Sequence, residues 1–158
     1  MFRVIKNFFT EDEINILKQS SSNCLDDSRF IPTKFFSREH KKALKACFSF
    51  VGEESVVGVE QWAFHTDFTS LPDEHQDRDE ELFEKTGELS FPICSCVIYL
   101  DIEDLVGAEL EIGSTKIVPE TGMLVLIGPE VWHRVADIVS GKRHSLNYNF
   151  WNKPLYSS

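Results

Sequence analysis

Trp62-Ala63-Phe64-His65-Thr66-Asp67 ends in a histidine and an aspartate two positions apart. Side chains alternate between the two faces of an extended strand, so His65 and Asp67 would point one way and Thr66 the other. An imidazole nitrogen and a carboxylate oxygen on one face can bind the same ion. We therefore predict that His65 and Asp67 are two ligands of a metal site, which a distant histidine would complete.

The candidates for that third ligand are His40, His75, His133 and His144. His40 falls in a predicted helix, and His75 falls in a long acidic segment where a rigid position is harder to maintain. His133 lies on a short predicted strand, residues 131–135, that follows a Gly-Pro turn. We predict His133 as the third ligand. Two histidines and one carboxylate form the face that non-haem Fe(II) oxygenases use.

The whole chain sets limits on fold and partners. Its 158 residues fit one domain with a single core. A net charge of −10 opposes tight binding to duplex nucleic acid, because such binding depends on lysine and arginine. We find neither a signal peptide nor an apolar run long enough to span a bilayer, so we expect a soluble, cytoplasmic protein without a membrane partner.

The four cysteines are expected to be free thiols, since nothing else in the sequence indicates secretion. Cys94 and Cys96 would share one strand face and could form a soft-metal pair. A lone Cys-x-Cys, however, lacks the second pair found in structural zinc sites.

Two helices are predicted before the strands begin. Thr10 and Glu13 form a capping-box pattern that starts a helix from about residue 11 to 20. Ser37 can cap a second, amphipathic helix over residues 38–51. The basic side of that helix is either a solvated face or a lysine patch that binds an acidic partner.

After Gly52 the sequence changes to short strands separated by glycine-containing turns. They are predicted at residues 56–65, 92–101, 108–112, 116–118, 123–127, 131–135 and 144–151. Strands of this length and spacing indicate a sandwich or barrel, with the helices covering one outer face.

The last strand carries a polar row. Arg143 and Ser145 share a face with Asn147 and Asn149, while the residues between them share the other face. A polar row turned inward lines a pocket, since an ordinary core would hold apolar residues there. Arg143 would bind a carboxylate through paired hydrogen bonds, with a nearby hydroxyl as an additional donor.

These features together resemble the 2-oxoglutarate and Fe(II) dependent dioxygenases, in particular the prolyl 4-hydroxylase-like branch, over nearly the whole chain. His65-Thr66-Asp67 is similar to the family's His-x-Asp, and His133 to its distal histidine. Arg143 matches the family's co-substrate cation. Tyr99 resembles the tyrosine that also contacts the distal carboxylate of 2-oxoglutarate, and Ser145 is the predicted neighbouring hydroxyl.

The resemblance implies a double-stranded β-helix, a jelly-roll variant, with helical support over about residues 1–51 and a core over about 56–151. It implies that Fe(II), 2-oxoglutarate and O2 are used to hydroxylate a substrate C–H bond, with succinate and carbon dioxide as products and ascorbate as a possible reductant. A carboxylate at Asp67 favours hydroxylation over halogenation. The expected substrate is a peptide or protein residue such as proline.

Several alternatives remain open on the sequence. The protein could be a small-molecule hydroxylase of the same class, or a cupin-like module that holds a metal or a small acid without turnover. His65, His133 and Arg143 could each have a purely structural role. The acidic segment 68–91 is either a lid that attracts a basic or neutral substrate or a solvated insertion.

Overall fold

The computed structural model describes residues 1–22, 27–66 and 73–157. Its helices are α1 (Glu11–Ser21), α2 (Arg38–Val51) and α3 (Glu80–Thr86), with a 3-10 turn at Thr33–Phe35. Its strands are β1 (Phe2–Ile5), β2 (Arg29–Pro32), β3 (Gly58–His65), β4 (Cys94–Gly107), β5 (Leu110–Ile112), β6 (Thr115–Ile117), β7 (Leu124–Ile127), β8 (Arg134–Val135) and β9 (Ile138–Trp151). None of the described helices has the length and apolar character needed to cross a membrane.

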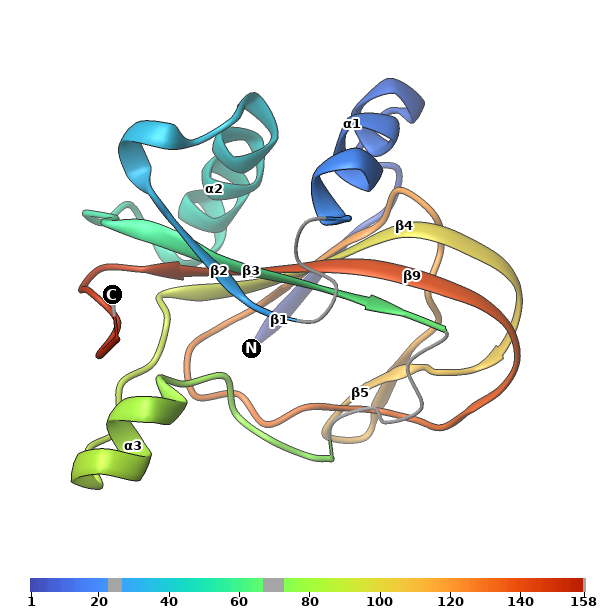
Figure 1. Cartoon of the computed structure of the whole chain (residues 1–158). Helices are drawn as coiled ribbons and strands as arrows, with labels where there is room; N and C mark the ends of the chain where they lie inside the picture. The colour runs from blue at the N-terminus through green and yellow to red at the C-terminus, as the bar shows by residue number, and fades with distance from the viewer. Residues whose placement is uncertain (23–26, 67–72, 158) are drawn as a thin grey trace.

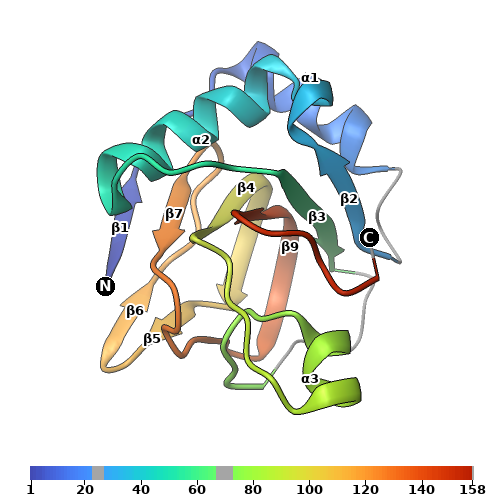
Figure 2. The ribbon, with the colours of Figure 1, turned by 90° about the vertical axis from the view of Figure 1, so that its left-hand side faces the viewer.

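The described strands form two antiparallel sheets. The larger sheet has the order β1-β7-β4-β9-β3-β2, and the smaller has the order β6-β5-β8. Helices α1 and α2 lie on one face of the larger sheet, and the smaller sheet lies on the other side (Figures 1 and 2). The predicted fold class, a mainly β jelly-roll core with flanking helices, is confirmed.

Strand alternation divides the interior into two cores. On β9, Leu146, Tyr148 and Phe150 face the helices and belong to the first core. On β4, Val97 and Tyr99 face the smaller sheet and belong to the second core. Because β4 and β9 are covered on both faces, their central residues are almost all buried.

The polar row of β9 lies on the face opposite the helices, as predicted. All four of its residues are buried, with exposures of 2% for Arg143, 0% for Ser145, 7% for Asn147 and 3% for Asn149. Four polar side chains in the interior need partners, so this row marks the region where a ligand would be bound.

Both helices begin at the predicted capping residues, but in α2 a histidine replaces the usual glutamate of the capping box. In α1, Thr10 Oγ1 accepts from Glu13 N and Glu13 Oε1 accepts from Thr10 N. In α2, His40 Nδ1 takes the role of the usual glutamate and accepts from Ser37 N at 3.0 Å. His40 Nε2 then carries the proton and donates to Gln61 Oε1 at 2.8 Å, which ties α2 to β3.

The outer ends of β4 and β9 bend toward the smaller sheet (Figure 1). Gly107 and Gly141 adopt φ angles of +83° and +91° there. A Cβ on Gly141 would lie 2.2 Å from Asp104 O, and one on Gly107 would lie 2.2 Å from Asp137 O. Both positions therefore require glycine for conformation and for space.

Several boundaries differ from the sequence prediction. Strands β4 and β9 extend beyond residues 92–101 and 144–151, because they pair with each other through their bent outer ends. Residues Arg29–Pro32 form β2, which is not among the predicted strands. Proline is tolerated at residue 32 because β2 is an edge strand. Within the acidic segment 68–91, α3 (Glu80–Thr86) is capped by Asp79, whose carboxylate accepts from Leu82 N.

A buried histidine joins α1 to β9 and makes stability depend on pH. His144 Nε2 lies 3.0 Å from Ser21 Oγ, and the His144 side chain is buried. Burial, followed by the nearby charges of His65 and Lys18, lowers the pKa of His144 to about 4, although Asp101 acts in the opposite direction. The unfolded chain therefore takes up this proton at a higher pH than the folded chain.

We predict that the free energy of unfolding falls as the pH drops from about 7 to about 5. The contribution of His144 is roughly 2 kcal/mol, since its pKa in the unfolded chain is about 6.5. His144→Gln should reduce this pH dependence by that amount in urea unfolding at the two pH values. An identical pH dependence in the variant and the native protein would contradict the assignment.

Candidate metal centre and cavity

His75, Asp77 and His133 bring their ligand atoms within 4.8 Å of one another. Asp77 lies between the two imidazoles, with its Oδ1 3.3 Å from His75 Nε2 and its Oδ2 3.6 Å from His133 Nε2. Neighbouring ligands at about 2.1 Å from a first-row metal lie roughly 3 Å apart, so these separations suit a shared ion. No other such group of three is found in the described ranges 1–22, 27–66 and 73–157.

Backbone hydrogen bonds hold the two histidines side by side. His75 N donates to His133 O, and His133 N donates to His75 O, each at 2.9 Å. This isolated bridge fixes a segment that otherwise lies outside both sheets. The ring centroids are consequently only 4.4 Å apart.

Further hydrogen bonds set the tautomer of each ring. His75 Nδ1 lies 2.7 Å from Asp73 O, and His133 Nδ1 lies 3.0 Å from Val131 O. A carbonyl oxygen only accepts, so each Nδ1 must carry the proton. Both Nε2 atoms are then unprotonated in the neutral ring and can bind a metal, the arrangement that orients metal-binding histidines generally.

Burial and the charges within this group suit Asp77 and His133 to metal binding, whereas the raised pKa of His75 means that a metal competes with a proton there. Burial acts to raise the pKa of Asp77, but His75 and His133 lower it overall. Burial lowers the pKa of His133. Burial also acts to lower the pKa of His75, but its hydrogen bonds to Asp77 and to the Asp73 carbonyl raise it overall. Asp77 is thus an anion and His133 a neutral ligand.

The structure does not bring His65 to His133. Strand alternation points Trp62 and Phe64 toward the cavity beside the triad and turns His65 toward the helices. There the His65 ring lies 4.7 Å from that of His144, which contacts α1. Asp67 lies outside the described residues. Of the predicted ligands, only His133 is in the described metal group.

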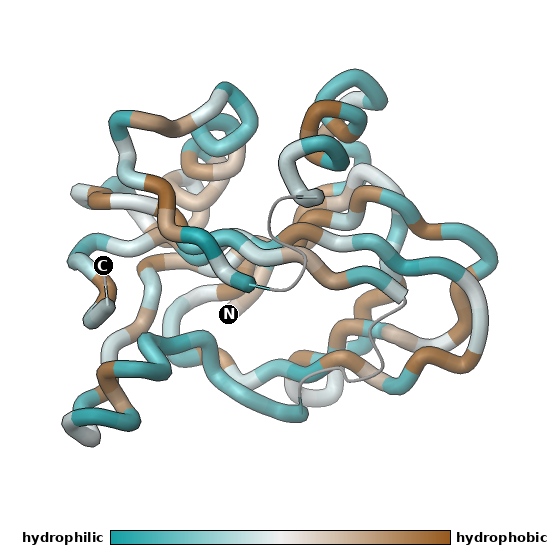
Figure 3. The backbone as a smooth tube through the Cα atoms, in the orientation of Figure 1, coloured by the Kyte–Doolittle hydropathy of each residue, from teal (hydrophilic) through white to brown (hydrophobic). Residues whose placement is uncertain are grey.

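The His-x-Asp pair beside His133 is His75-Gln76-Asp77. Its spacing equals that of His65-Thr66-Asp67, so the signal was present in the sequence. His75 is considered above only as a third ligand, and its place in an acidic segment counts against a rigid position there. The stretch from residue 73 to α3 is hydrophilic (Figure 3). A hydrophilic composition alone does not predict the backbone bridge that fixes this stretch.

A cavity of about 140 Å³ adjoins the triad. Its apolar walls include Trp62, Phe64, Val97, Leu110 and Val135. Besides the triad, its polar residues are Arg143 and Asn147. Arg143 is 2% exposed, and its guanidinium carbon lies 5.5 Å from the Tyr99 ring centroid and 6.0 Å from that of Phe64. Within the described residues it has no ion pair, and Arg143 Nε and Asn147 Nδ2 lack hydrogen-bond partners.

Tyr99 and Ser145 lie next along the same sheet face. They are opposite each other in the β4–β9 register, and both are fully buried. Their hydroxyl oxygens have no hydrogen-bond partner among the described residues. Burial raises the pKa of Tyr99, and the charge of Arg143 partly offsets that effect. Tyr99 and Arg143 therefore lie next to each other on this face of the sheet.

Cys94 and Cys96 point to the opposite face and belong to the helix-facing core. Cys96 Sγ lies 3.4 Å from Cys47 Sγ, and the described cysteines are all free and buried. Neither residue belongs to the described metal group, so the alternative of a Cys-x-Cys metal pair gains no support.

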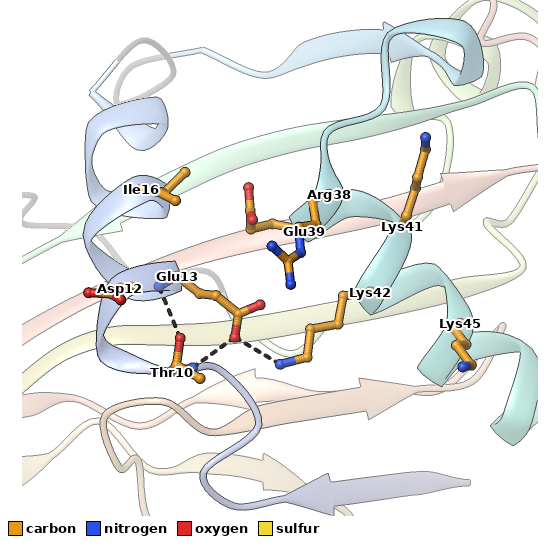
Figure 4. A pocket seen from close by; sticks show the side chains of 9 residues that line it. All are labelled: Thr10, Asp12, Glu13, Ile16, Arg38, Glu39, Lys41, Lys42 and Lys45. Atoms are coloured by element: carbon orange, nitrogen blue, oxygen red, sulfur yellow. Dashed lines mark hydrogen bonds and ion pairs between the residues drawn. The ribbon is translucent and has the colours of Figure 1, made fainter.

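A separate groove of about 660 Å³ lies between α1 and α2 on the outer face of the helices (Figure 4). It mixes basic and acidic side chains, among them Arg38, Lys41, Asp12 and Glu39. Lys42 is already engaged by Glu13 at 2.9 Å (Figure 4). The predicted lysine patch is thus partly neutralised from α1, and the groove has no consistent charge to select a partner.

No protein-family model matches this chain, and neither does any curated protein sequence. Solved structures do match. The chain is similar to the viral collagen prolyl hydroxylase of Paramecium bursaria Chlorella virus-1 in complex with 2-oxoglutarate, with a TM-score of 0.64, 16% identity and 94% of each chain covered. It is also similar to a Pseudomonas putida prolyl 4-hydroxylase, with a TM-score of 0.67, 16% identity, and 97% of this chain and 93% of that one covered.

A third similar structure is HygX from Streptomyces hygroscopicus with nickel and 2-oxoglutarate bound. Its TM-score is 0.57 at 15% identity, with 95% of this chain and 81% of that one covered. The chain therefore has the fold of the 2-oxoglutarate and Fe(II) dependent oxygenases, the double-stranded β-helix that the sequence resemblance implied.

We predict that His75→Ala, Asp77→Ala and His133→Ala each weaken binding of Ni(II) or Co(II) by about a hundredfold or more. Each variant removes a direct ligand, and the loss of a residue that only supports a ligand already costs about 10 to 100-fold in metal affinity. His65→Ala is the matched control and should change the affinity by no more than about threefold. Calorimetric titration of the four variants measures this. If His65→Ala abolished binding while His75→Ala did not, the triad would be wrong.

Proposed function

We propose that this protein is an Fe(II) and 2-oxoglutarate dependent dioxygenase that hydroxylates a C–H bond of its substrate. The observation that carries the proposal is the position of Arg143. It is a buried cation with no acidic partner in the described structure, and it lines the same cavity as His75, Asp77 and His133. An unpaired buried charge is costly, so a ligand carboxylate supplies the missing partner.

The donor set fits the metal that this activity requires. Two imidazole nitrogens and one carboxylate oxygen suit Fe(II), and Mn, Co, Ni or Zn can substitute for it. Fe(II) with 2-oxoglutarate and O2 would supply the oxidising chemistry, which yields succinate, carbon dioxide and hydroxylated product. Ascorbate would serve as the reductant that keeps the iron ferrous.

Arg143 would bind the distal carboxylate of 2-oxoglutarate through paired N–H groups. Tyr99, Ser145 and Asn147 surround it with two hydroxyls and an amide that have unused donors in the described structure. The apolar walls of the cavity keep water away from this anion, which strengthens each of these hydrogen bonds. These residues thus bind and orient the co-substrate toward the three metal ligands.

The proposed substrate is a residue of a peptide or protein, with proline as the first candidate. Two of the similar structures are prolyl hydroxylases. A small molecule is the second candidate, because HygX has also been solved with hygromycin B bound. A cupin-like module that binds metal or a small acid without turnover is the non-catalytic alternative.

We predict that the purified protein with Fe(II), ascorbate and 2-oxoglutarate releases succinate, and that Arg143 controls the co-substrate affinity. Arg143→Lys should raise the Kd for 2-oxoglutarate about tenfold, since charge is kept but paired geometry is lost, and Arg143→Ala about a hundredfold. Both variants should bind metal normally.

Lys142→Ala is the matched control, because Lys142 is adjacent in sequence but pairs with Asp101 at 2.7 Å. Its Kd for 2-oxoglutarate should equal that of the native protein. A native affinity in Arg143→Ala would refute the assigned carboxylate site. Metal and 2-oxoglutarate binding without any succinate release would favour the non-catalytic module.

A further inference from the structure

A second cavity, of about 200 Å³, lies beside the triad. It shares Trp62, His75 and Asp77 with the cavity that contains Arg143. Its other polar residues include Glu60 and Asn149. The metal group thus borders two cavities, and the second has an acidic residue where the first has a basic one.

Glu60 and Asn149 lie directly opposite each other in the β3–β9 register. Asn149 is 3% exposed and lines the cavity, and its Oδ1 has no hydrogen-bond partner in the described structure. Its amide group also interacts with the Glu60 carboxylate. A buried carbonyl oxygen without a donor is unfavourable, so this position requires a donor from a ligand or from water.

The Glu60 carboxylate has no cationic partner among the residues described. Burial raises the pKa of Glu60, and the negative charge of Asp77 raises it further, although the neighbouring polar side chains of Trp151, Asn149 and Ser28 oppose this. A cation placed in the cavity would therefore stabilise the ionised carboxylate.

The arginine that lines this cavity is not available for this purpose. Arg78 lines the same cavity, but its Nε lies 3.1 Å from Glu80 Oε1. Its guanidinium carbon also lies 3.9 Å from the ring centroid of Phe83, which holds it against α3. Arg78 and Glu80 neutralise each other, and the acceptors Glu60 and Asn149 remain.

We propose that this second cavity binds a cationic group of the substrate, an amine or a guanidinium, through Glu60 and Asn149. The inference rests on the proposed function and names the substrate class of the same site. Both groups carry several N–H donors, so one cation can donate to the carboxylate and to the orphaned amide oxygen together. In a peptide substrate the cation is a lysine or arginine side chain at or beside the hydroxylated residue.

The two cavities then bind ligand groups of opposite charge. Arg143 selects the anionic co-substrate on one side of the metal ligands, and Glu60 selects a cationic substrate group on the other. Exchange of the two ligands would leave like charges facing each other, which is unfavourable. The net charge of −10 also favours the approach of a cation.

The test uses the protein loaded with Ni(II) and 2-oxoglutarate, titrated with four capped tripeptides, Gly-X-Gly, in which X is lysine, arginine, glutamine or glutamate. The indole N–H signal of Trp62 in NMR spectra reports binding, because Trp62 lines the cavity. We expect the lysine or the arginine peptide to bind at least about tenfold more tightly than the glutamine peptide, and the glutamate peptide to bind most weakly. Whichever of the lysine and arginine peptides binds more tightly shows whether the site prefers an amine or a guanidinium.

Glu60→Gln keeps the shape of the side chain and removes its charge, so it should abolish the preference for the cationic peptide. Glu84→Gln removes one charge from an exposed position on α3 and should retain the preference. The Kd for 2-oxoglutarate should be native in both variants, which shows that both are folded. Equal binding of the lysine, arginine and glutamine peptides, or an unchanged preference in Glu60→Gln, would overturn the inference.

The inference and the proposed function can fail separately. Absence of succinate release with Fe(II), ascorbate, 2-oxoglutarate and any of the peptides would contradict the proposed function. Succinate release that responds equally to cationic and neutral peptides would keep the proposed function and reject the cationic substrate site.

Discussion

The antiparallel pairing of β4 with β9 is the constraint on which the rest of the structure depends. It places two long strands in the middle of the larger sheet, so that each has one face toward the helices and one toward the smaller sheet. Alternation then gives Leu146, Tyr148 and Phe150 to the helix-facing core and Arg143, Ser145 and Asn147 to the other face. A shift of register by one residue would exchange these two sets and bury the polar row against the helices.

Part of the site could be predicted from the sequence because it depends on this alternation. The inward position of Arg143 and Tyr99 follows from a period of two along a strand, and the structure bears it out. The helix starts at Thr10 and Ser37 were also predictable, since capping is decided by residues only three positions apart. Local rules sufficed in these cases.

The rest depends on a contact between distant segments. Sequence spacing alone could not distinguish His65-Thr66-Asp67 from His75-Gln76-Asp77, because both have the same pattern. The choice is made by the backbone bridge from His75 to His133, which joins positions far apart in the chain. His65 occupies the last position of β3, where alternation turns it toward α1. The acidic segment, expected to be a lid or a solvated insertion, contains two of the three side chains of the candidate metal group.

The most direct test of the account is a crystal structure with Mn(II) and 2-oxoglutarate bound, with the metal located by its anomalous scattering. We expect one anomalous peak at about 2.0–2.3 Å from His75 Nε2, His133 Nε2 and an Asp77 carboxylate oxygen, with the distal carboxylate of 2-oxoglutarate on Arg143. A peak bound by His65, or a metal-free triad with 2-oxoglutarate away from Arg143, would contradict the account.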